Sequence, residues 1–274
     1  MVTVLDTGGV AVSASQRRWR ARISRGLILW IFGFYVLAPL YAGARFALQN
    51  DNGNFSFHSV AVIPAQAGFS DAFWYSTRLA LVTVIGVLVL VVPTIIYAHL
   101  RAPGVRPALE VISLLPIVFP PIVLILGFMH TAPTWLLIWP YHLAILYVVI
   151  SLPFVYRSLD AGLLALDLST LVEAGRSLGA RVTTIVWRVI LPNLTSALVS
   201  SVALVVALVY SEYTMASFQV TPTLPVWIAQ FSMSDGHITT AAAMLSLVGA
   251  WVLLAVVLVA DLGRLQWRQR RARA

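Results

Sequence analysis

The sequence predicts an all-α integral membrane protein with six transmembrane helices. Of its 274 residues, 60% are apolar and 10% are charged, and the mean hydropathy is +0.90. A soluble domain is usually about 45–50% apolar and about a quarter charged, so this chain has too few charges to cover a surface in water. Six apolar stretches are each long enough to cross a hydrocarbon core of about 30 Å, which takes about 20 helical residues.

The six predicted spans are separated by connections of very different length and polarity. The spans cover residues 27–48, 78–100, 108–129, 135–156, 194–218 and 239–260. The connections at 49–71 and 219–238 are predicted to be loops, and those at 101–107 and 131–134 are predicted to be short turns. Only the connection at 157–193 is both long and charged.

The positions of the arginines predict the orientation. All 18 basic residues are arginine, and 16 of them precede span one or follow span two, four or six. Short cytoplasmic segments retain basic residues, whereas exported segments lack them. Both termini and the 157–193 connection are therefore predicted to be cytoplasmic. The expected divisions are a basic N-terminal segment at 1–26, a transmembrane domain at 27–262 that includes the cytoplasmic segment at 157–192, and a basic tail at 263–274.

The start of the chain allows a second interpretation. A basic stretch, an apolar run and Ala42-Gly43-Ala44 together resemble a cleavable signal peptide. The apolar run is long for that purpose and contains Pro39, which favours an uncleaved first helix. Either outcome leaves the other five spans unchanged.

Prolines recur inside the spans and are densest in span three, at Pro116, Pro120 and Pro121. Each proline removes an amide and frees a carbonyl, which lipid tolerates only where protein or water satisfies the backbone. Span three is therefore predicted to be broken or to line a cavity, and a static packing kink is the alternative.

The composition excludes several functions. The chain has no cysteine, which excludes disulfides, thiol nucleophiles and cysteine metal sites. It has no lysine, which excludes a phosphate-binding P-loop and Schiff-base chemistry. If ATP drives this protein, another chain must bind it. The arginines lie at the ends of apolar runs rather than between aromatic residues on one face, so no nucleic-acid partner is expected. No metal site and no catalytic residue are predicted.

The segment at 157–192 predicts a short helix outside the membrane, over residues 170–180. Thr170 followed by Glu173 is a capping box, in which each side chain satisfies a free backbone amide. Gly179 supplies the stop, because glycine readily takes a positive φ. A short, capped, amphipathic helix in the cytoplasm is typical of a docking element.

Residues of this segment resemble a signature of the permease subunits of type I ABC importers. That signature reads Glu-Ala-Ala, then Gly, then Ile-x-Leu-Pro. The matching residues here are Glu173, Ala174, Gly175, Gly179, Val189, Leu191 and Pro192. Gly175 replaces the second alanine and Val189 replaces isoleucine. A membrane-interface helix with a chance match is the alternative.

The resemblance implies that 170–180 is a coupling helix that docks into an ATP-binding cassette ATPase dimer. Glu173 would meet a basic residue of the ATPase or brace the loop, and Gly179 would form the turn. ATP and Mg would be bound by the ATPase, and this chain would bind no cofactor. The resemblance also implies a second permease subunit, expected to be a different chain, an extracytoplasmic solute-binding protein, and a place in the bacterial cytoplasmic (inner) membrane.

Charged residues inside the spans need a reason, because each costs several kcal/mol in lipid. Arg78, Glu110 and Asp261 lie near predicted span ends and are expected to reach the membrane interface. Glu212 lies 18 residues beyond Leu194, about 27 Å along a helix.

Aromatic residues flank Glu212, and a carboxylate beside aromatic rings can attract a passing organic cation by charge pairing and cation–π contact. The alternative is a glutamate that is solvated at the membrane interface within an aromatic belt. The predicted pathway residues are Glu212, Tyr210, Ser211, Tyr213, Pro120 and Pro121.

Two stretches resemble the permeases for polyamines, ferric iron, thiamine and phosphonates. They are 211–218 followed by Leu224-Pro225, and Leu114-Leu115-Pro116 followed by Pro120-Pro121. The resemblance implies a small organic cation such as a polyamine, with a sugar, phosphonate, thiamine or ferric iron as alternatives. That group has two adjacent acids where this chain has Ser211-Glu212.

Two other function classes remain open. An intramembrane lipid-modifying enzyme would need acidic or histidine residues gathered at one depth, whereas the ten acids here are scattered. A passive channel would not require a docking helix.

Overall fold

The computed structural model describes residues 14–49 and 52–273. In that part of the chain all regular secondary structure is helical, apart from one isolated bridge between Gln49 and Phe55. The predicted all-α class is confirmed. Of the predicted basic termini, residues 1–13 and residue 274 lie outside the described residues.

The helices follow one another along the chain with short connections. They are α1 (Ala14–Ala47), α2 (His58–Ala61), η1 (Ile63–Ala65), α3 (Phe69–Arg101), η2 (Pro103–Val105), α4 (Arg106–Val118), α5 (Pro121–Thr131), α6 (Thr134–Leu137), α7 (Leu143–Leu164), α8 (Leu168–Ser177), α9 (Val182–Ile185), the π-helical turn η3 (Val186–Ile190), α10 (Leu191–Asn193), α11 (Thr195–Ser211), α12 (Thr214–Phe218), α13 (Leu224–Phe231) and α14 (Gly236–Arg273).

Four helices are long and apolar enough to cross a membrane by themselves. They are Arg25–Ala47 of α1, α3, α7 and Gly236–Val256 of α14. Two bent pairs bring the number to six if each pair is one span. The first is Pro103–Val118 with α5, bent by 96°, and the second is Val182–Asn193 with α11, bent by 68°.

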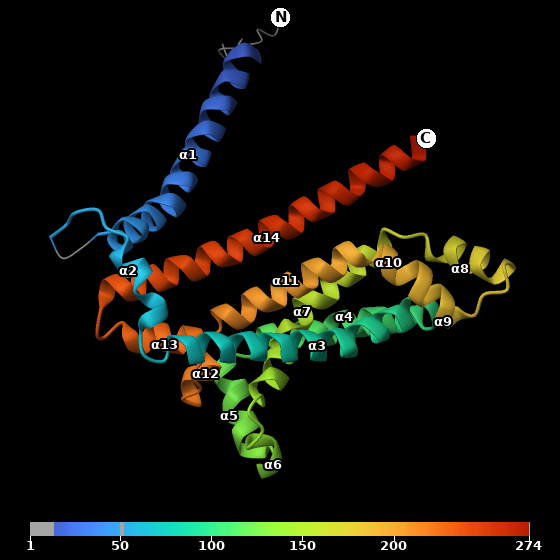
Figure 1. Ribbon diagram of the computed structural model, residues 1–274. Coiled ribbons are helices and arrows are strands. Elements are labelled where there is room, and N and C mark those ends of the chain that lie inside the picture. The colour runs from blue at the N-terminus through green and yellow to red at the C-terminus, as the bar shows by residue number, and fades with distance from the viewer. Residues whose placement is uncertain (1–13, 50–51, 274) are drawn as a thin grey trace, which may run out of the picture.

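The bundle of α3, α4, α7 and α11 forms the centre of the molecule (Figure 1). The segment containing α8 and α9 lies at one end of this bundle, and α12, α13, α5 and α6 lie at the other end (Figure 1). Helices α1 and α14 lean away from the bundle and contact each other. The segment that resembles a coupling helix is therefore far from the corner between α11 and α12 that contains Glu212.

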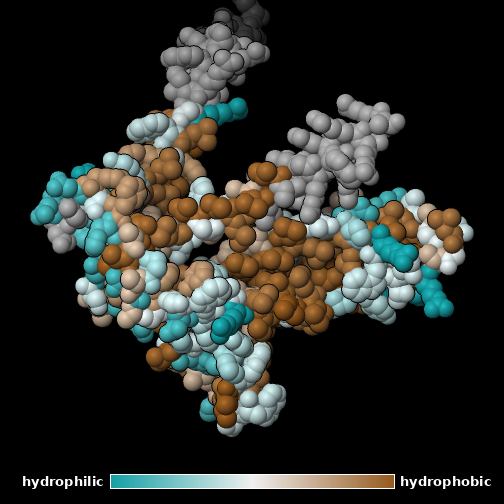
Figure 2. Space-filling view, viewed as in Figure 1, coloured by the Kyte–Doolittle hydropathy of each residue, from teal (hydrophilic) through white to brown (hydrophobic). Residues whose placement is uncertain are grey.

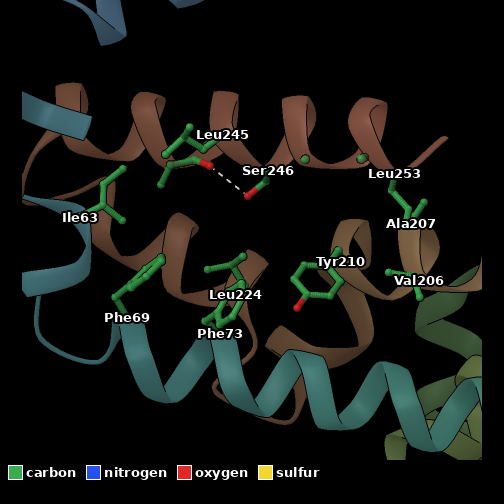
Figure 3. Close-up of a pocket in the computed structure, with 13 residues that line it drawn as sticks. Ile63, Phe69, Phe73, Val206, Ala207, Tyr210, Leu224, Leu245, Ser246 and Leu253 are labelled. Carbon is green, nitrogen blue, oxygen red and sulfur yellow. Dashed lines mark hydrogen bonds between the residues drawn. The ribbon is translucent and has the colours of Figure 1, made fainter. Parts of the chain in front are cut away.

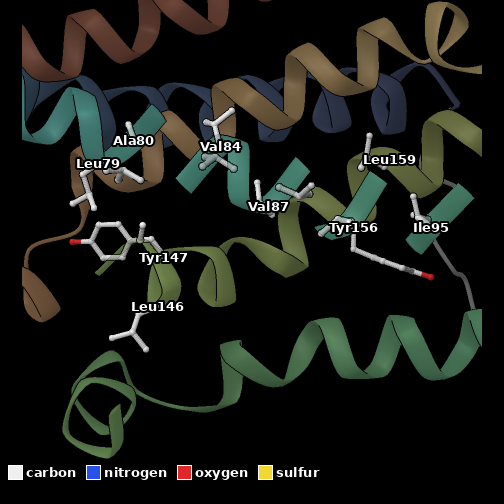
Figure 4. Packing of buried hydrophobic residues seen from close by; sticks show 14 of the residues in the cluster. Leu79, Ala80, Val84, Val87, Ile95, Leu146, Tyr147, Tyr156 and Leu159 are labelled. Carbon is white, nitrogen blue, oxygen red and sulfur yellow. The ribbon is translucent and has the colours of Figure 1, made fainter. Parts of the chain in front are cut away.

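The core lies between α3 and α7, where one face of each helix is fully buried. Leu79, Val87 and Ile95 of α3 face Tyr147 and Leu159 of α7 (Figure 4). Thr83 and Val91 are buried between them, so buried residues recur every three or four positions along α3 and form a continuous buried stripe.

The opposite face of α3 stays uncovered and apolar, with Leu81, Ile85 and Val89 all exposed. Brown apolar surface shows on the exterior of the molecule (Figure 2). Such faces suit lipid or a second membrane protein.

Span three breaks where the prolines predicted it. Phe119 and Pro120 both have extended backbones, with ψ of 124° and 139°. Each precedes a proline, and a residue before proline is driven out of the α region by the proline ring. Two such steps in succession end α4 and turn α5 by 96°.

Several predicted span boundaries are wrong. Helix α3 begins at Phe69, so Arg78 lies more than two turns inside a helix rather than at its end. Helix α7 begins at Leu143 rather than at 135, because α6 and a turn precede it.

The span predicted at 194–218 is also divided, since α11 ends at Ser211 and α12 follows as a separate helix. The predicted loop at 219–238 contains α13.

Candidate functional site

Helix α8 begins at a side-chain cap that lies earlier than the sequence predicted. Asp167 is the N-cap, and its carboxylate accepts hydrogen bonds from the Thr170 amide at 3.2 Å, the Thr170 hydroxyl at 2.7 Å and the Ser169 hydroxyl at 2.7 Å. The capping box at Thr170 and Glu173 is therefore wrong, because Asp167 offers two acceptor oxygens one turn earlier. The hydrogen bonds from Ser169 and then Thr170 lower the pKa of Asp167.

The other end of α8 is the predicted glycine stop, and this prediction is confirmed. Gly179 has φ +75°. Its amide donates to the Arg176 carbonyl at 2.8 Å, and the Ala180 amide donates to the Gly175 carbonyl at 3.0 Å. This pair of bonds is a Schellman motif, which satisfies the last carbonyls of a helix.

Gly175 allows α8 to pack closely on α9. A Cβ atom at this position would lie 2.6 Å from Ile185 Cδ1 and 2.7 Å from Ile185 Cγ1. Ile185 is buried. The departure from the alanine of the permease signature therefore has a local cause, since an alanine would require Ile185 to move.

The outward surface of this segment is mixed in chemistry and uncovered. Glu173, Ala174 and Arg176 are exposed on α8, which has no buried residue. Leu178 is 87% exposed and Trp187 is 72% exposed. Large apolar side chains this exposed, beside an acid and a base, form a surface suited to a protein partner.

The last part of the signature fixes the return into the bundle. Val189 and Leu191 are half-buried against the core. Pro192 is exposed and has no amide to donate to the carbonyl four residues earlier. The Asn193 side-chain amide donates to the Val189 carbonyl at 2.8 Å. A π-helical turn at η3 and the 68° bend before α11 accompany this interruption.

At the opposite end of the bundle, Glu212 ends α11. Its Oε1 accepts a hydrogen bond from the Met215 amide at 2.8 Å, and its Oε2 accepts from the Ala216 amide at 3.3 Å and from the Tyr147 hydroxyl at 2.7 Å. The carboxylate thus satisfies free amides at the start of α12 and ties the α11–α12 corner to α7. The predicted position of Glu212 within one continuous helix is wrong, because the chain breaks at this residue.

The predicted pathway residues fall into separate groups. Tyr210, Phe73 and Leu224 line a cavity of about 480 Å³ among α3, α11, α13 and α14 (Figure 3). The Tyr210 hydroxyl also shares a hydrogen bond of 2.6 Å with the Thr77 hydroxyl. Tyr210, Ser211 and Tyr213 together line a second, more open groove.

Glu212 lines neither of these two spaces. Pro120 and Pro121 lie at the α4–α5 bend and line neither of them. Among the described residues, no group of three or more histidines and acids could hold a metal ion.

Sequence reasoning missed two residues that shape these sites. Asp167 is also a good N-cap residue and lies three positions before Thr170. The path of the chain between α7 and α8 selects Asp167, and the sequence does not show that path. Tyr147 lies 65 residues from Glu212, so nothing local in the sequence pairs them.

Comparisons with known proteins give a partial relative and a related fold. No family model matches the chain. Over 70 residues the chain is 43% identical to a probable sulfate transport system permease protein, cysT, of Chlorokybus atmophyticus, and this match covers 26% of the chain and 24% of that relative. The chain therefore spans about a quarter of the length of the curated relative it matches.

The related fold comes from the crystal structure of a bacterial ABC transporter involved in the import of the acidic polysaccharide alginate. The TM-score is 0.60 and the identity is 15%, over 89% of this chain and 97% of the matched chain. The fold of the chain is therefore similar to that of a chain in this transporter. The chain is a multi-pass membrane protein.

Proposed function

We propose that this chain is the permease subunit of an ATP-driven, binding-protein-dependent importer, and that it forms half of a solute pathway. The observation that supports this most strongly is the exposed, doubly capped helix α8. It lies between α7 and the bent entry to α11, in a fold that matches nearly all of a chain from an ABC transporter. In this role the chain is a transport component and not an enzyme.

The proposed partners follow from the uncovered surfaces. An ATPase dimer, which would bind ATP and Mg, would receive α8 in a groove, with Leu178 as the apolar anchor and Glu173 as a charged contact. A second permease subunit would cover apolar faces of the bundle, because the apolar window of α1 has no buried residue and the outward face of α3 is exposed. An extracytoplasmic binding protein would deliver the solute.

The proposed orientation puts both termini and α8 in the cytoplasm of a bacterium, with the chain in its inner membrane. The distribution of 16 of the 18 arginines supports this orientation. A single cysteine can be introduced at Asn54, Ser169 or Asp235 in this cysteine-free chain. An impermeant reagent applied to intact cells should label Asn54→Cys and Asp235→Cys, and labelling of Ser169→Cys would overturn the orientation.

The solute class is inferred from the state of Glu212. A cation such as a polyamine was expected because Glu212 offered a negative charge. That carboxylate already accepts hydrogen bonds from two backbone amides and from Tyr147. The partial relative is named for sulfate transport, and neither cavity at this end is lined by an acid. We therefore favour a polar or anionic solute over a polyamine.

Co-purification tests the proposed role. The tagged chain, isolated from membranes, should retain an ATP-binding cassette ATPase. Leu178→Ser should lose that ATPase, because it removes the most exposed apolar side chain of the segment. Met233→Ser is the matched control, since Met233 is 93% exposed and follows α13, which lies at the other end of the bundle (Figure 1). Equal retention by both variants would contradict docking through this segment.

A further inference from the structure

A cluster of three charged or titratable side chains joins three helices at the end of the bundle nearest α8. Asp160 of α7 lies 3.2 Å from Arg106 Nη2 at the start of α4. The same Asp160 Oδ1 lies 3.1 Å from His99 Nε2 in the last turn of α3. The His99 side chain is only 4% exposed, whereas Asp160 and Arg106 are half-buried.

The imidazole of His99 meets oxygen atoms on both sides. Its Nδ1 lies 2.9 Å from the Ile95 carbonyl oxygen, and its Nε2 faces the carboxylate of Asp160. A carbonyl oxygen only accepts hydrogen bonds, so the contact with Ile95 requires a proton on Nδ1. Nε2 makes no directed hydrogen bond and lies in close contact with the Asp160 carboxylate.

Other polar and charged groups surround this junction. The Tyr156 hydroxyl donates to the Arg106 carbonyl at 3.2 Å. Glu110 pairs with Arg157 at 3.8 Å, and both of these side chains are more than half exposed. Arg101, in the same turn of α3 as His99, is exposed.

The position of Asp160 in α7 gives the cluster its significance. Helix α7 continues from Asp160 for one turn to Leu164, and the Asp167 cap of α8 follows at once. On another side of the same stretch, the Ser158 hydroxyl donates to the Ala197 carbonyl of α11 at 3.1 Å. The last turns of α7 are thus fastened to α3 and α4 by charge, and to α11 by close packing.

That packing is tightest at Gly162. A Cβ atom there would lie 2.7 Å from Ala197 Cβ and 2.8 Å from Leu194 Cδ1. Movement of α8 therefore has a rigid route into α7 and α11. Asp160 is the contact that extends this route to α4, which leads directly to the break at Pro120.

We propose that His99, Arg106 and Asp160 form a clamp that carries movement of the α8 segment to the broken α4–α5 span. They are positioning residues, since they act through helices and not on the solute. This inference rests on the proposed function, because it assumes that a partner moves α8.

The test needs no identified solute. The complex of chain and ATPase is placed in proteoliposomes with a single reporter cysteine, Val118→Cys, at the last residue of α4, where the side chain is 74% exposed. Trapping the ATPase with ATP and vanadate should change the rate at which a maleimide labels this cysteine. Asp160→Asn should reduce that change about tenfold while basal ATP hydrolysis and assembly persist. Glu110→Gln, in the same helix as Arg106, is the matched control and should behave as the parent chain.

A measurement on the isolated chain separates this inference from the proposed function. Asp160→Asn should accelerate deuterium exchange at the amides of 161–164, and Glu110→Gln should not. Equal exchange in the two variants, or an unchanged reporter response in Asp160→Asn, would overturn the clamp. If the chain binds no ATPase but this exchange difference is found, the proposed function fails and the clamp contact stands. If Asp160→Asn does not fold, Arg106→Gln removes the same contact and is held to the same outcomes.

Discussion

Replacement of Gly179 isolates the cost of one backbone conformation. Gly179 has φ +75°, and a Cβ atom added there would have no heavy atom within 4 Å. A side chain therefore meets no steric obstacle from the rest of the protein. Any loss of stability in α8 must come from holding an L-residue in the left-handed region.

The expected magnitude follows from that isolation. An ordinary L-residue in the left-handed region costs about 1–2 kcal/mol relative to glycine, and asparagine costs less. With RT near 0.6 kcal/mol, this range corresponds to about a 5- to 30-fold increase in local opening of the helix end. A β-branched residue is the least tolerant of a positive φ, so the order of damage should be Asn, then Ala, then Val.

Hydrogen–deuterium exchange at the Ala180 amide measures this opening directly. That amide donates to the Gly175 carbonyl in the Schellman motif, and its protection reports whether the helix end is closed. Gly104 provides the matched control, because it also has open space around it and its φ is not positive. If Gly179→Val exchanges no faster than Gly104→Val, with both read at the amide of residue 180, the reasoning about φ is refuted.

Three further predictions concern the outer corner, the α8–α9 contact and the α8 cap. Glu212→Gln should raise the rate of amide hydrogen exchange in the first turn of α12 about tenfold. Tyr147→Phe leaves both amide contacts of Glu212 in place and should raise this rate less. If Glu212→Gln instead loses cation uptake with unchanged exchange, a role of Glu212 in the pathway is favoured. Gly175→Ala should lower the free energy of unfolding by about 1–3 kcal/mol through its clash with Ile185, offset by about 1 kcal/mol because alanine has the higher helix propensity. In unfolding measurements, the effects of Gly175→Ala and Ile185→Ala should not add in the double variant, and additive effects would contradict the contact. The hydrogen bonds of Asp167 lower its pKa, so its capping contribution to the stability of α8 is complete above about pH 5 and is lost as the pH falls below about 4. The protection of the Thr170 amide from hydrogen exchange, corrected for the intrinsic pH dependence of exchange, should follow this course in the parent chain and should not change with pH in Asp167→Asn.

The helical class and the presence of several apolar helices long enough to cross a membrane could be predicted because they depend on totals along the chain. Apolar length decides which segments enter a membrane, and that property is additive over neighbouring residues. The positions of helix ends could not be predicted in the same way. Residues 69–77 stay helical in α3 although they include Asp71, because α3 packs there against α13, where the Leu224 amide donates to the Ser76 hydroxyl at 2.8 Å.

Local chemistry explains why one end of α8 was predicted correctly and the other was not. A glycine that must take positive φ has few substitutes, so Gly179 marks the stop by itself. Asp167 and Thr170 are both good N-cap residues three positions apart. The choice between them depends on how the chain leaves α7, and that is a property of the packed bundle.

Glu212 shows how a charge in the sequence can have a structural explanation that the sequence itself does not reveal. The cost of a carboxylate near a membrane requires compensation, and this requirement pointed to a cationic solute. In the fold, the compensation comes from the protein itself, through two amides that α12 would otherwise leave free and through a tyrosine on α7. The two amides are free only because the chain breaks at Glu212, and the hydropathy of 194–218 gives no sign of that break. The charge is therefore accounted for by the corner it stabilises, and under the proposed function the chemistry of the solute would be set by the cavities beside it.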